Sequence, residues 1–356
     1  MTSRSNAKLE APHRRLETGS RGSQVLERVR ERFAIVAYRV GSWVVAHLPP
    51  AFARFVIARG SQLAYFLLPT KRRWSNANFG HVLGLPPGHR RVRATALAAY
   101  GEYAKYVVEV MRLPRLPKER ATKLVVGSDL DKVEPIWRGS KGGVIIALAH
   151  LGNAEAAAAG VASRGWPISV LADDTSYPEL FEAFRRSRQE WGVTVIAWRN
   201  IREVYGVLRR REMLGLFVDW GYRDDGVPVR LFGAWTTFPA GPAALAAKTG
   251  SRILPIAIRR RPDGNTFTIT VSDPIEVASM APADQLAATQ RLADAIQASI
   301  AAAPQQWYSF KPLWPADPAD GVELERRAEL MAGGVALEAA AAETPVHPPE
   351  QEPVLA

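Results

Sequence analysis

The sequence predicts an α/β fold with a central, largely parallel sheet flanked by helices. Apolar runs of strand length alternate with stretches of helical periodicity between residues 124 and 218. This alternation is typical of sheets whose neighbouring strands run parallel and whose two faces are covered by helices. With 47% hydrophobic residues, the chain also has enough apolar surface for a substantial core. The expected strands are 124–126, 144–149, 168–171, 193–197 and 214–218, and the expected helices between them are 130–137, 154–162, 178–191 and 201–210.

The chain begins with a basic region. Residues 1–24 are polar and poor in apolar side chains, which predicts a disordered basic arm. Amphipathic helices are expected over residues 25–48 and 51–68. Residues 1–93 carry 17 basic and 4 acidic side chains, a balance of +13 in a chain with a net charge of +11. The partner of this region is therefore expected to be anionic.

An anionic membrane surface is the favoured partner. Arg39, Arg54 and Arg59 interrupt the apolar stretches, so neither helix is expected to span a bilayer. Basic residues beside Trp and Phe suit an interfacial anchor, and we expect residues 25–74 to associate with a membrane in this way. The alternative is that these helices pack on the domain with their arginines solvated. Nucleic-acid binding is disfavoured because the segment is aliphatic and has no recognisable binding motif.

The remaining elements frame the alternating region. A helix is expected over residues 91–112, with tyrosines at helical spacing that favour core packing. Runs at 253–259 and 266–271 predict an antiparallel hairpin, and a long helix follows at 282–303. Residues 25–316 are expected to form a single domain. The segment 317–356, with two basic and nine acidic side chains, is predicted to be a disordered acidic low-complexity tail with at most a transient helix near residues 322–331.

Two kinds of site are excluded or not supported. The chain has no cysteine, which excludes disulfides, thiolate nucleophiles and thiolate metal ligands. Its six histidines are scattered, so no group has metal-ligand spacing and no metal is predicted.

The strongest candidate for chemistry follows the run 144–149. The run ends at His150, and Glu155 opens an alanine-rich helix after Gly152 and Asn153. Residues five apart lie roughly 140° apart around one helix, so His150 and Glu155 can meet only if the chain bends between them. A carboxylate on one ring nitrogen would leave the other as a general base. The alternative is a histidine that only ends a strand in a satisfied hydrogen bond.

A second cluster follows the run 214–218. Asp219 and Asp224 lie at the carboxyl end of a strand, the edge at which open α/β sheets hold ligands and the edge that also carries His150. They could orient a histidine or position a hydroxyl, although Asp224 also suits a plain turn. Arg188 could hold phosphate groups of a ligand or belong to a solvated helix face.

Taken together, the motifs resemble the bacterial lipid A biosynthesis lauroyl/myristoyl acyltransferase family over about residues 26–315, and most closely its phosphatidylinositol mannoside acyltransferases. The mannoside enzymes tend to have Trp-Asp where this chain has Ala154-Glu155, and glutamate is the residue of the lipid A branch. The matching elements are His150 to Glu155, Arg188 to Gly192, the Gly-Val-x-Val-x-x-Phe-Gly pattern at 226–233, and the segments 241–246 and 305–314.

The resemblance implies an O-acyltransferase that moves a fatty acyl chain from acyl-CoA, a co-substrate, to a hydroxyl of a lipid or glycolipid such as a phosphatidylinositol mannoside. It places the enzyme as a peripheral or monotopic protein at the cytoplasmic face of the cell membrane, with no other cofactor. His150 would remove the hydroxyl proton and Glu155 would orient it, while Arg188, Asp219 and Asp224 would hold the substrates. Direct attack is expected because the chain has no cysteine and no Gly-x-Ser-x-Gly elbow.

Two alternatives stay open at this point. The acceptor could be a lipid A precursor or a lysophospholipid, or the protein could be an inactive binding protein of the membrane surface.

Overall fold

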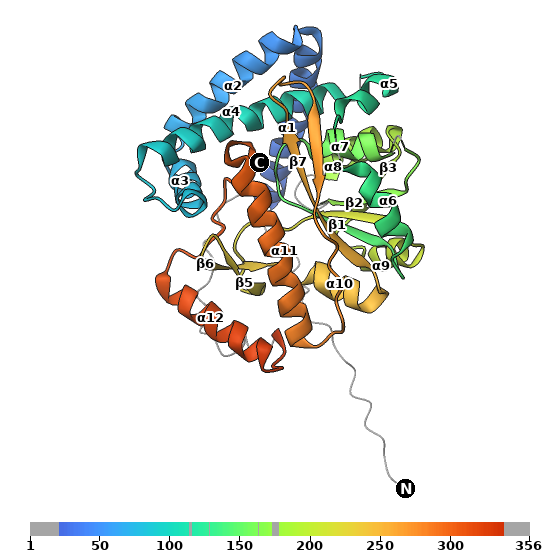
Figure 1. The fold of residues 1–356 in the computed structure, drawn as a ribbon. Helices are drawn as coiled ribbons and strands as arrows, with labels where there is room; N and C mark the ends of the chain where they lie inside the picture. The colour runs from blue at the N-terminus through green and yellow to red at the C-terminus, as the bar shows by residue number, and fades with distance from the viewer. Residues whose placement is uncertain (1–20, 114–115, 128, 163, 173–177, 338–356) are drawn as a thin grey trace. The chain divides into compact units, whose positions relative to one another are not determined.

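The structure is a computed structural model that describes residues 21–113, 116–127, 129–162, 164–172 and 178–337 (Figure 1). Helix α1 runs from Arg21 to His47, and its residues up to Gly41 form a unit of their own. The second unit begins at Ser42 and contains every feature described below. Most of the expected N-terminal arm lies outside the described residues, and residues 21–24 already belong to α1.

A six-stranded sheet forms the centre of the second unit. Its order is β3-β2-β4-β1-β7-β8, and every neighbouring pair is parallel except the antiparallel pair β7 and β8. The predicted α/β class, the largely parallel sheet and the hairpin at its edge are therefore confirmed. The strands are β1 (Val144–Leu148), β2 (Ile168–Ala172), β3 (Val193–Ala197), β4 (Met213–Phe217), β7 (Arg252–Arg260) and β8 (Phe267–Val271).

The expected strand at 124–126 is wrong. Thr122–Leu124 form a short 3-10 helix, η2, and Val125 makes only an isolated bridge to Phe267. Gly127 then takes a left-handed conformation with φ of 55°, which turns the chain away after one paired residue.

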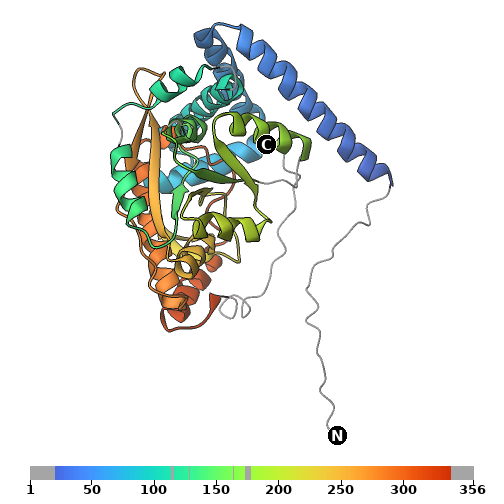
Figure 2. The ribbon, with the colours of Figure 1, turned by 90° about the vertical axis from the view of Figure 1, so that its right-hand side faces the viewer.

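The two faces of the sheet are covered by different helices (Figures 1 and 2). Ile145 and Ala147 of β1 belong to one core, together with side chains of α9, α10 and α11. Val144 and Ile146 belong to the other core, together with side chains of α6 and α7. Side chains alternate along a strand, so one apolar run supplies both cores. These helices are α6 (Leu130–Arg138), α7 (Ala154–Ala162), α9 (Ile201–Arg209), α10 (Gly241–Thr249) and α11 (Pro282–Ala302); α8 (Pro178–Glu190) contacts β3.

Helices from the N-terminal part of the second unit pack beside the sheet. Helices α2 and α4 lie side by side in Figure 1 and contact each other along their lengths. Proline opens both α2 and α3, at a position where the missing N–H costs no hydrogen bond. Among the described helices, none has the length and apolar content needed to cross a bilayer. The bounds are α2 (Pro50–Leu67), α3 (Pro69–Leu83), α4 (Arg90–Arg112) and the short α5 (Lys118–Ala121).

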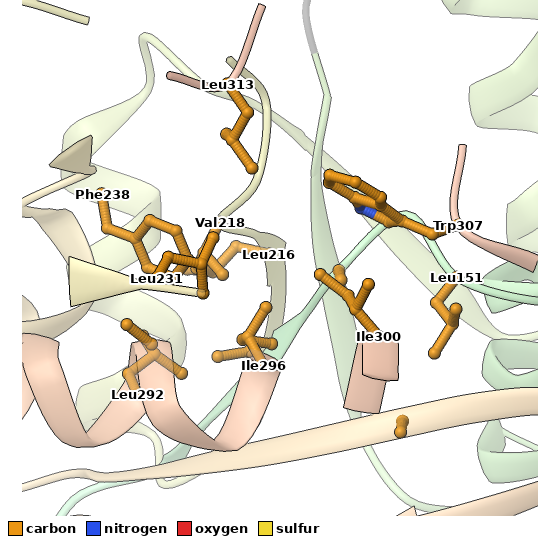
Figure 3. Close-up of a cluster of buried hydrophobic side chains, with 14 of the residues drawn as sticks. Leu151, Leu216, Val218, Leu231, Phe238, Leu292, Ile296, Ile300, Trp307 and Leu313 are labelled. Carbon is orange, nitrogen blue, oxygen red and sulfur yellow. The ribbon is translucent and has the colours of Figure 1, made fainter. Parts of the chain in front are cut away.

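The first core extends from the sheet to the segment that follows α11. Trp307, which comes after the 3-10 helix η3 (Pro304–Gln306), is fully buried and lies with Ile300 and Leu151 in Figure 3. Leu151 and Trp307 also form an isolated antiparallel bridge. The C-terminal segment is thereby joined to the turn that follows β1.

The prediction of a disordered tail from residue 317 is wrong for its first part. Helix α12 (Pro318–Ala332) packs against α11 and against the hairpin of β5 (Val227–Leu231) and β6 (Ala234–Phe238). Leu324, Ala328 and Met331 are buried, because their spacing places them on one face of a helix despite the biased composition. Residues 338–356 lie outside the described residues.

Arg327 joins α12 to the loop that follows β4. It is 3% exposed and donates hydrogen bonds to the carbonyl oxygens of Asp224, at 2.7 Å, and Gly226, at 2.8 Å. We expect Arg327→Met to lower the free energy of unfolding by about 1–3 kcal/mol, because two carbonyls would lose a charged donor. Urea denaturation measures the change.

The neighbouring Arg326 provides a matched control. It pairs with Glu323 near the surface of the same helix, and such pairs contribute less than about 1 kcal/mol. Equal losses for Arg326→Met and Arg327→Met would contradict the role given to Arg327.

Candidate active site

The backbone conformation of the turn between β1 and α7 is fixed by Gly152 and Asn153. Gly152 has φ of 66°, and a Cβ added to it would lie 2.1 Å from the carbonyl oxygen of Ile258, so no other residue fits. Its N–H donates to the carbonyl oxygen of Gln306. Asn153 accepts a hydrogen bond from the N–H of Ala156 and thereby caps α7.

A partly buried ion-pair network also contacts Asn153. Its amide nitrogen donates to Glu109 of α4 at 2.9 Å. Glu109 is also paired with Arg260 of β7, whose side chain is almost fully buried and also contacts Glu102. The turn that carries His150 is therefore anchored to both α4 and the sheet.

Asp219 holds His150. The Nδ1 atom of His150 lies 2.7 Å from a carboxylate oxygen of Asp219, and the N–H of His150 donates to the same carboxylate at 2.9 Å. Strand β4, which precedes Asp219, runs parallel to β1, so the two residues follow neighbouring strand ends. The indole N–H of Trp307 donates a third hydrogen bond to Asp219 at 2.8 Å. The carboxylate fixes the orientation of the imidazole through Nδ1 and leaves the other ring nitrogen, Nε2, available as a base.

Asp219 remains ionised in this setting. Burial alone would raise its pKa, but the adjacent His150 and the hydrogen bonds from His150 and Trp307 together hold the pKa below its usual range. Its side chain has no exposed surface, whereas a quarter of the His150 side chain is exposed. A buried anion is thus placed beneath a partly accessible imidazole.

Glu155 does not contact His150, which corrects the expected pairing. It lies in the first turn of α7 and forms a two-pronged ion pair with Arg188 of α8, with one nitrogen–oxygen distance of 2.5 Å. The bend at Gly152 does occur, but the first turn of α7 directs Glu155 toward α8. The structure therefore brings together His150 with Asp219 and, separately, Glu155 with Arg188.

Asp224 lies away from these groups. It is exposed in the turn before β5, and its carbonyl oxygen accepts a hydrogen bond from Arg327. It is not part of the cavity that contains His150. Its expected role in substrate binding stays a prediction.

His150 lines a cavity of about 380 Å³. The imidazole of His150 stacks on Phe217, with ring centroids 4.0 Å apart. The ring centroid of Trp220 lies 5.4 Å from that of His150. The tyrosine stripe of α4 serves two purposes, since Tyr100, Tyr103 and Tyr106 all line the cavity and Tyr100 also belongs to the buried core. The other lining residues come mainly from α2, the start of α3 and the segment after α11, and include Ser61, Ala64, Leu68, Lys71, Tyr308, Ser309, Phe310 and Lys311.

A second, narrow cavity of about 80 Å³ adjoins the first. Its wall is almost entirely apolar and comes from the sheet and from α6, α7 and α8. Glu155 and Arg188 are its charged residues. Ala154 and Phe217 line both cavities, so the two are neighbours close to His150.

Comparison with known proteins identifies the family. The sequence model of the family described as bacterial lipid A biosynthesis acyltransferase matches residues 23–315. The chain belongs to this acyltransferase family. The family predicted from the motifs is therefore confirmed, and the enzyme class with it.

Curated relatives of this acyltransferase have a more specific name. The phosphatidylinositol mannoside acyltransferase of Mycolicibacterium smegmatis is 29% identical over 307 residues, which cover 83% of this chain and 94% of that protein. The protein of the same name from Mycobacterium tuberculosis is 29% identical over 301 residues, which cover 83% of this chain and 91% of that protein.

The site of this acyltransferase includes residues that were not singled out from the sequence. Trp307, Lys311 and Tyr308 lie within the matching segment 305–314, whose density of aromatic residues was the available signal. Lys71 lies within residues 25–74, which the sequence assigned to the membrane anchor and not to the site, and Trp220 carried no pattern of its own. Among the described residues, no group of His, Asp or Glu side chains is arranged to hold a metal ion.

Proposed function

We propose that this acyltransferase moves a fatty acyl chain from acyl-CoA to a hydroxyl of a glycolipid such as a phosphatidylinositol mannoside. The observation that carries the proposal is the pair of His150 and Asp219, in which a buried carboxylate holds an imidazole that lines an aromatic cavity. Membership of the family and the names of the curated relatives support the reaction and the class of acceptor.

In this proposal His150 acts as the general base. Its Nε2 atom accepts the proton of the acceptor hydroxyl while the hydroxyl oxygen attacks the thioester carbonyl carbon. The carbon–sulfur bond then breaks, and the imidazolium returns the proton to the leaving thiolate. The products are an ester and free coenzyme A. Asp219 offsets the positive charge of the imidazolium during the step.

The two cavities suit the two substrates. The apolar cavity fits the start of an acyl chain, and the thioester would lie where it meets the larger cavity, beside Ala154 and Phe217. The larger cavity suits a sugar headgroup, because aromatic rings offer flat apolar faces and tyrosine hydroxyls donate hydrogen bonds. Burial raises the pKa of Tyr103, which keeps its hydroxyl protonated.

The proposal also includes attachment to the anionic, cytoplasmic face of the membrane. Helix α2 presents an apolar strip whose members are each between 54% and 67% exposed: Phe52, Phe55, Leu63, Phe66 and Leu67. Arg59 lies within the strip and over the ring of Phe55. Leu68 continues the strip and also lines the cavity, so a lipid could reach His150 from this surface.

We expect Phe66→Glu to weaken binding to vesicles of phosphatidylcholine and phosphatidylglycerol by about tenfold or more, because an apolar contact is lost and a like charge is added. Vesicle flotation measures the bound fraction. Trp198→Glu is the control, since Trp198 is 49% exposed but is not part of α2. If both variants float equally well, the strip is not the membrane contact.

The function is tested with labelled acyl-CoA and a panel of glycolipids, in which mass spectrometry identifies any acylated product. We expect an ester of a phosphatidylinositol mannoside. Acylation only of a lipid A precursor or a lysophospholipid would replace the proposed acceptor, and binding of lipids without any transfer would contradict the proposed activity.

A further inference from the structure

Two lysines line the same cavity as His150. Lys71 lies in the first turn of α3, and Lys311 lies in the segment that follows α11. The Nζ atom of Lys311 is 4.2 Å from the ring centroid of Trp220, and that of Lys71 is 4.5 Å from the ring centroid of Trp74. Aromatic rings next to a cation restrict its position without neutralising its charge.

The cavity that contains these lysines has a positive surface. Within the described residues, Asp219 is the acidic member of its lining. The Asp219 side chain has no exposed surface and is already bonded to His150 and Trp307. Among the lining residues that the structure describes, an entering ligand would therefore meet the ammonium groups of Lys71 and Lys311 and no accessible carboxylate, which favours an anion.

Lys71 does not stabilise α3, so helix stability does not explain why a lysine occupies this position. The N-terminus of a helix favours negative charge, and a cation in the first turn is unfavourable. The first turn of α3 has no acidic residue and contains Lys71, and Arg72 and Arg73 follow directly. Lys71 forms no ion pair with any residue that the structure describes. A ligand phosphate would provide the missing countercharge.

We propose that Lys71 and Lys311 bind a phosphate group of a substrate while a hydroxyl of the substrate lies at His150. This inference rests on the proposed function and names the chemistry by which the acceptor is recognised. The phosphate would belong to the phosphodiester of a lipid headgroup, since Leu68 connects the exposed strip of α2 to the cavity one helical turn before Lys71. The phosphates of acyl-CoA are the other source of the same chemistry.

The test combines kinetics with direct binding. We expect Lys71→Met and Lys311→Met each to raise the KM for a phosphatidylinositol mannoside about tenfold or more and to leave kcat within about twofold. The KM for a phosphate-free alkyl mannoside should not change. Lys311→Arg should retain most of the affinity, and Arg73→Met is the matched control because Arg73 is exposed and does not line the cavity.

Direct binding can be measured without catalysis. Calorimetric titration with glycerophosphoinositol should give a binding signal with the wild-type protein and at least a tenfold weaker one with the Lys71→Met/Lys311→Met double variant. If the wild-type protein acylates no glycolipid yet shows this difference, the proposed function fails and the phosphate site stands. A rise in the KM for acyl-CoA alone would assign the site to the donor and overturn its assignment to the lipid. If acyl transfer occurs and no KM or binding signal changes, the phosphate site is wrong.

Discussion

The variant His150→Ala is expected to lose about 10²–10⁴-fold of the rate of acyl transfer, because a positioned general base contributes an acceleration of this size. Among the described lining residues, no other side chain would then take the proton of the acceptor hydroxyl with comparable ease. Initial rates at saturating acyl-CoA and acceptor measure the effect.

His81 supplies a matched control for this loss. It is a second half-buried histidine that stacks on Trp314 and does not line the cavity. His81→Ala should retain the rate within about twofold. Equal rates of acyl transfer in the wild-type protein and in His150→Ala would refute the mechanism.

The second large effect is expected for Asp219→Asn. The asparagine side chain fits the same space, but it has no charge to offset the imidazolium and can favour the wrong tautomer of His150. We expect kcat to fall by about 10²–10⁴-fold while the KM values for both substrates change little. The signature is a loss in kcat with both substrates still bound.

The same substitution has a predictable pH dependence of stability. The pKa of Asp219 is lowered in the folded protein, so the ionised carboxylate stabilises the fold at a pH above its ordinary pKa. This contribution is lost as the pH falls toward the lowered pKa. The difference in free energy of unfolding between the wild-type protein and Asp219→Asn should therefore be constant near neutral pH and shrink in acid. A difference that grows in acid would contradict the assignment.

The fold was largely predictable from the sequence, because buried parallel strands must be apolar along their whole length. The run at 144–149 forms β1, and its residues supply both cores. Composition misled at α12, where alanine and glutamate suggested a tail. Buried positions such as Leu324 reveal a helix only when their spacing is given more weight than the composition.

The candidate site was predictable in part. His150 was identified because a polar residue that ends a buried strand at the carboxyl edge of a sheet is well placed for chemistry. The carboxylate that holds it was not assigned correctly, because local spacing favoured Glu155. Asp219 lies 69 residues from His150 in the chain, and the pair depends on β4 lying next to β1. Strand order in a sheet does not follow from the order of strands in the chain.

His150 and Asp219 are proposed to act as one unit in acyl transfer, and a double-mutant cycle tests this coupling. Rates of acyl transfer are measured for His150→Ala, Asp219→Asn and the double variant. If the two residues act together, the double variant is slower than His150→Ala by no more than about threefold, because Asp219 has no function without the imidazole. If the two losses multiply instead, Asp219 acts independently of His150, and the two residues do not form a catalytic unit.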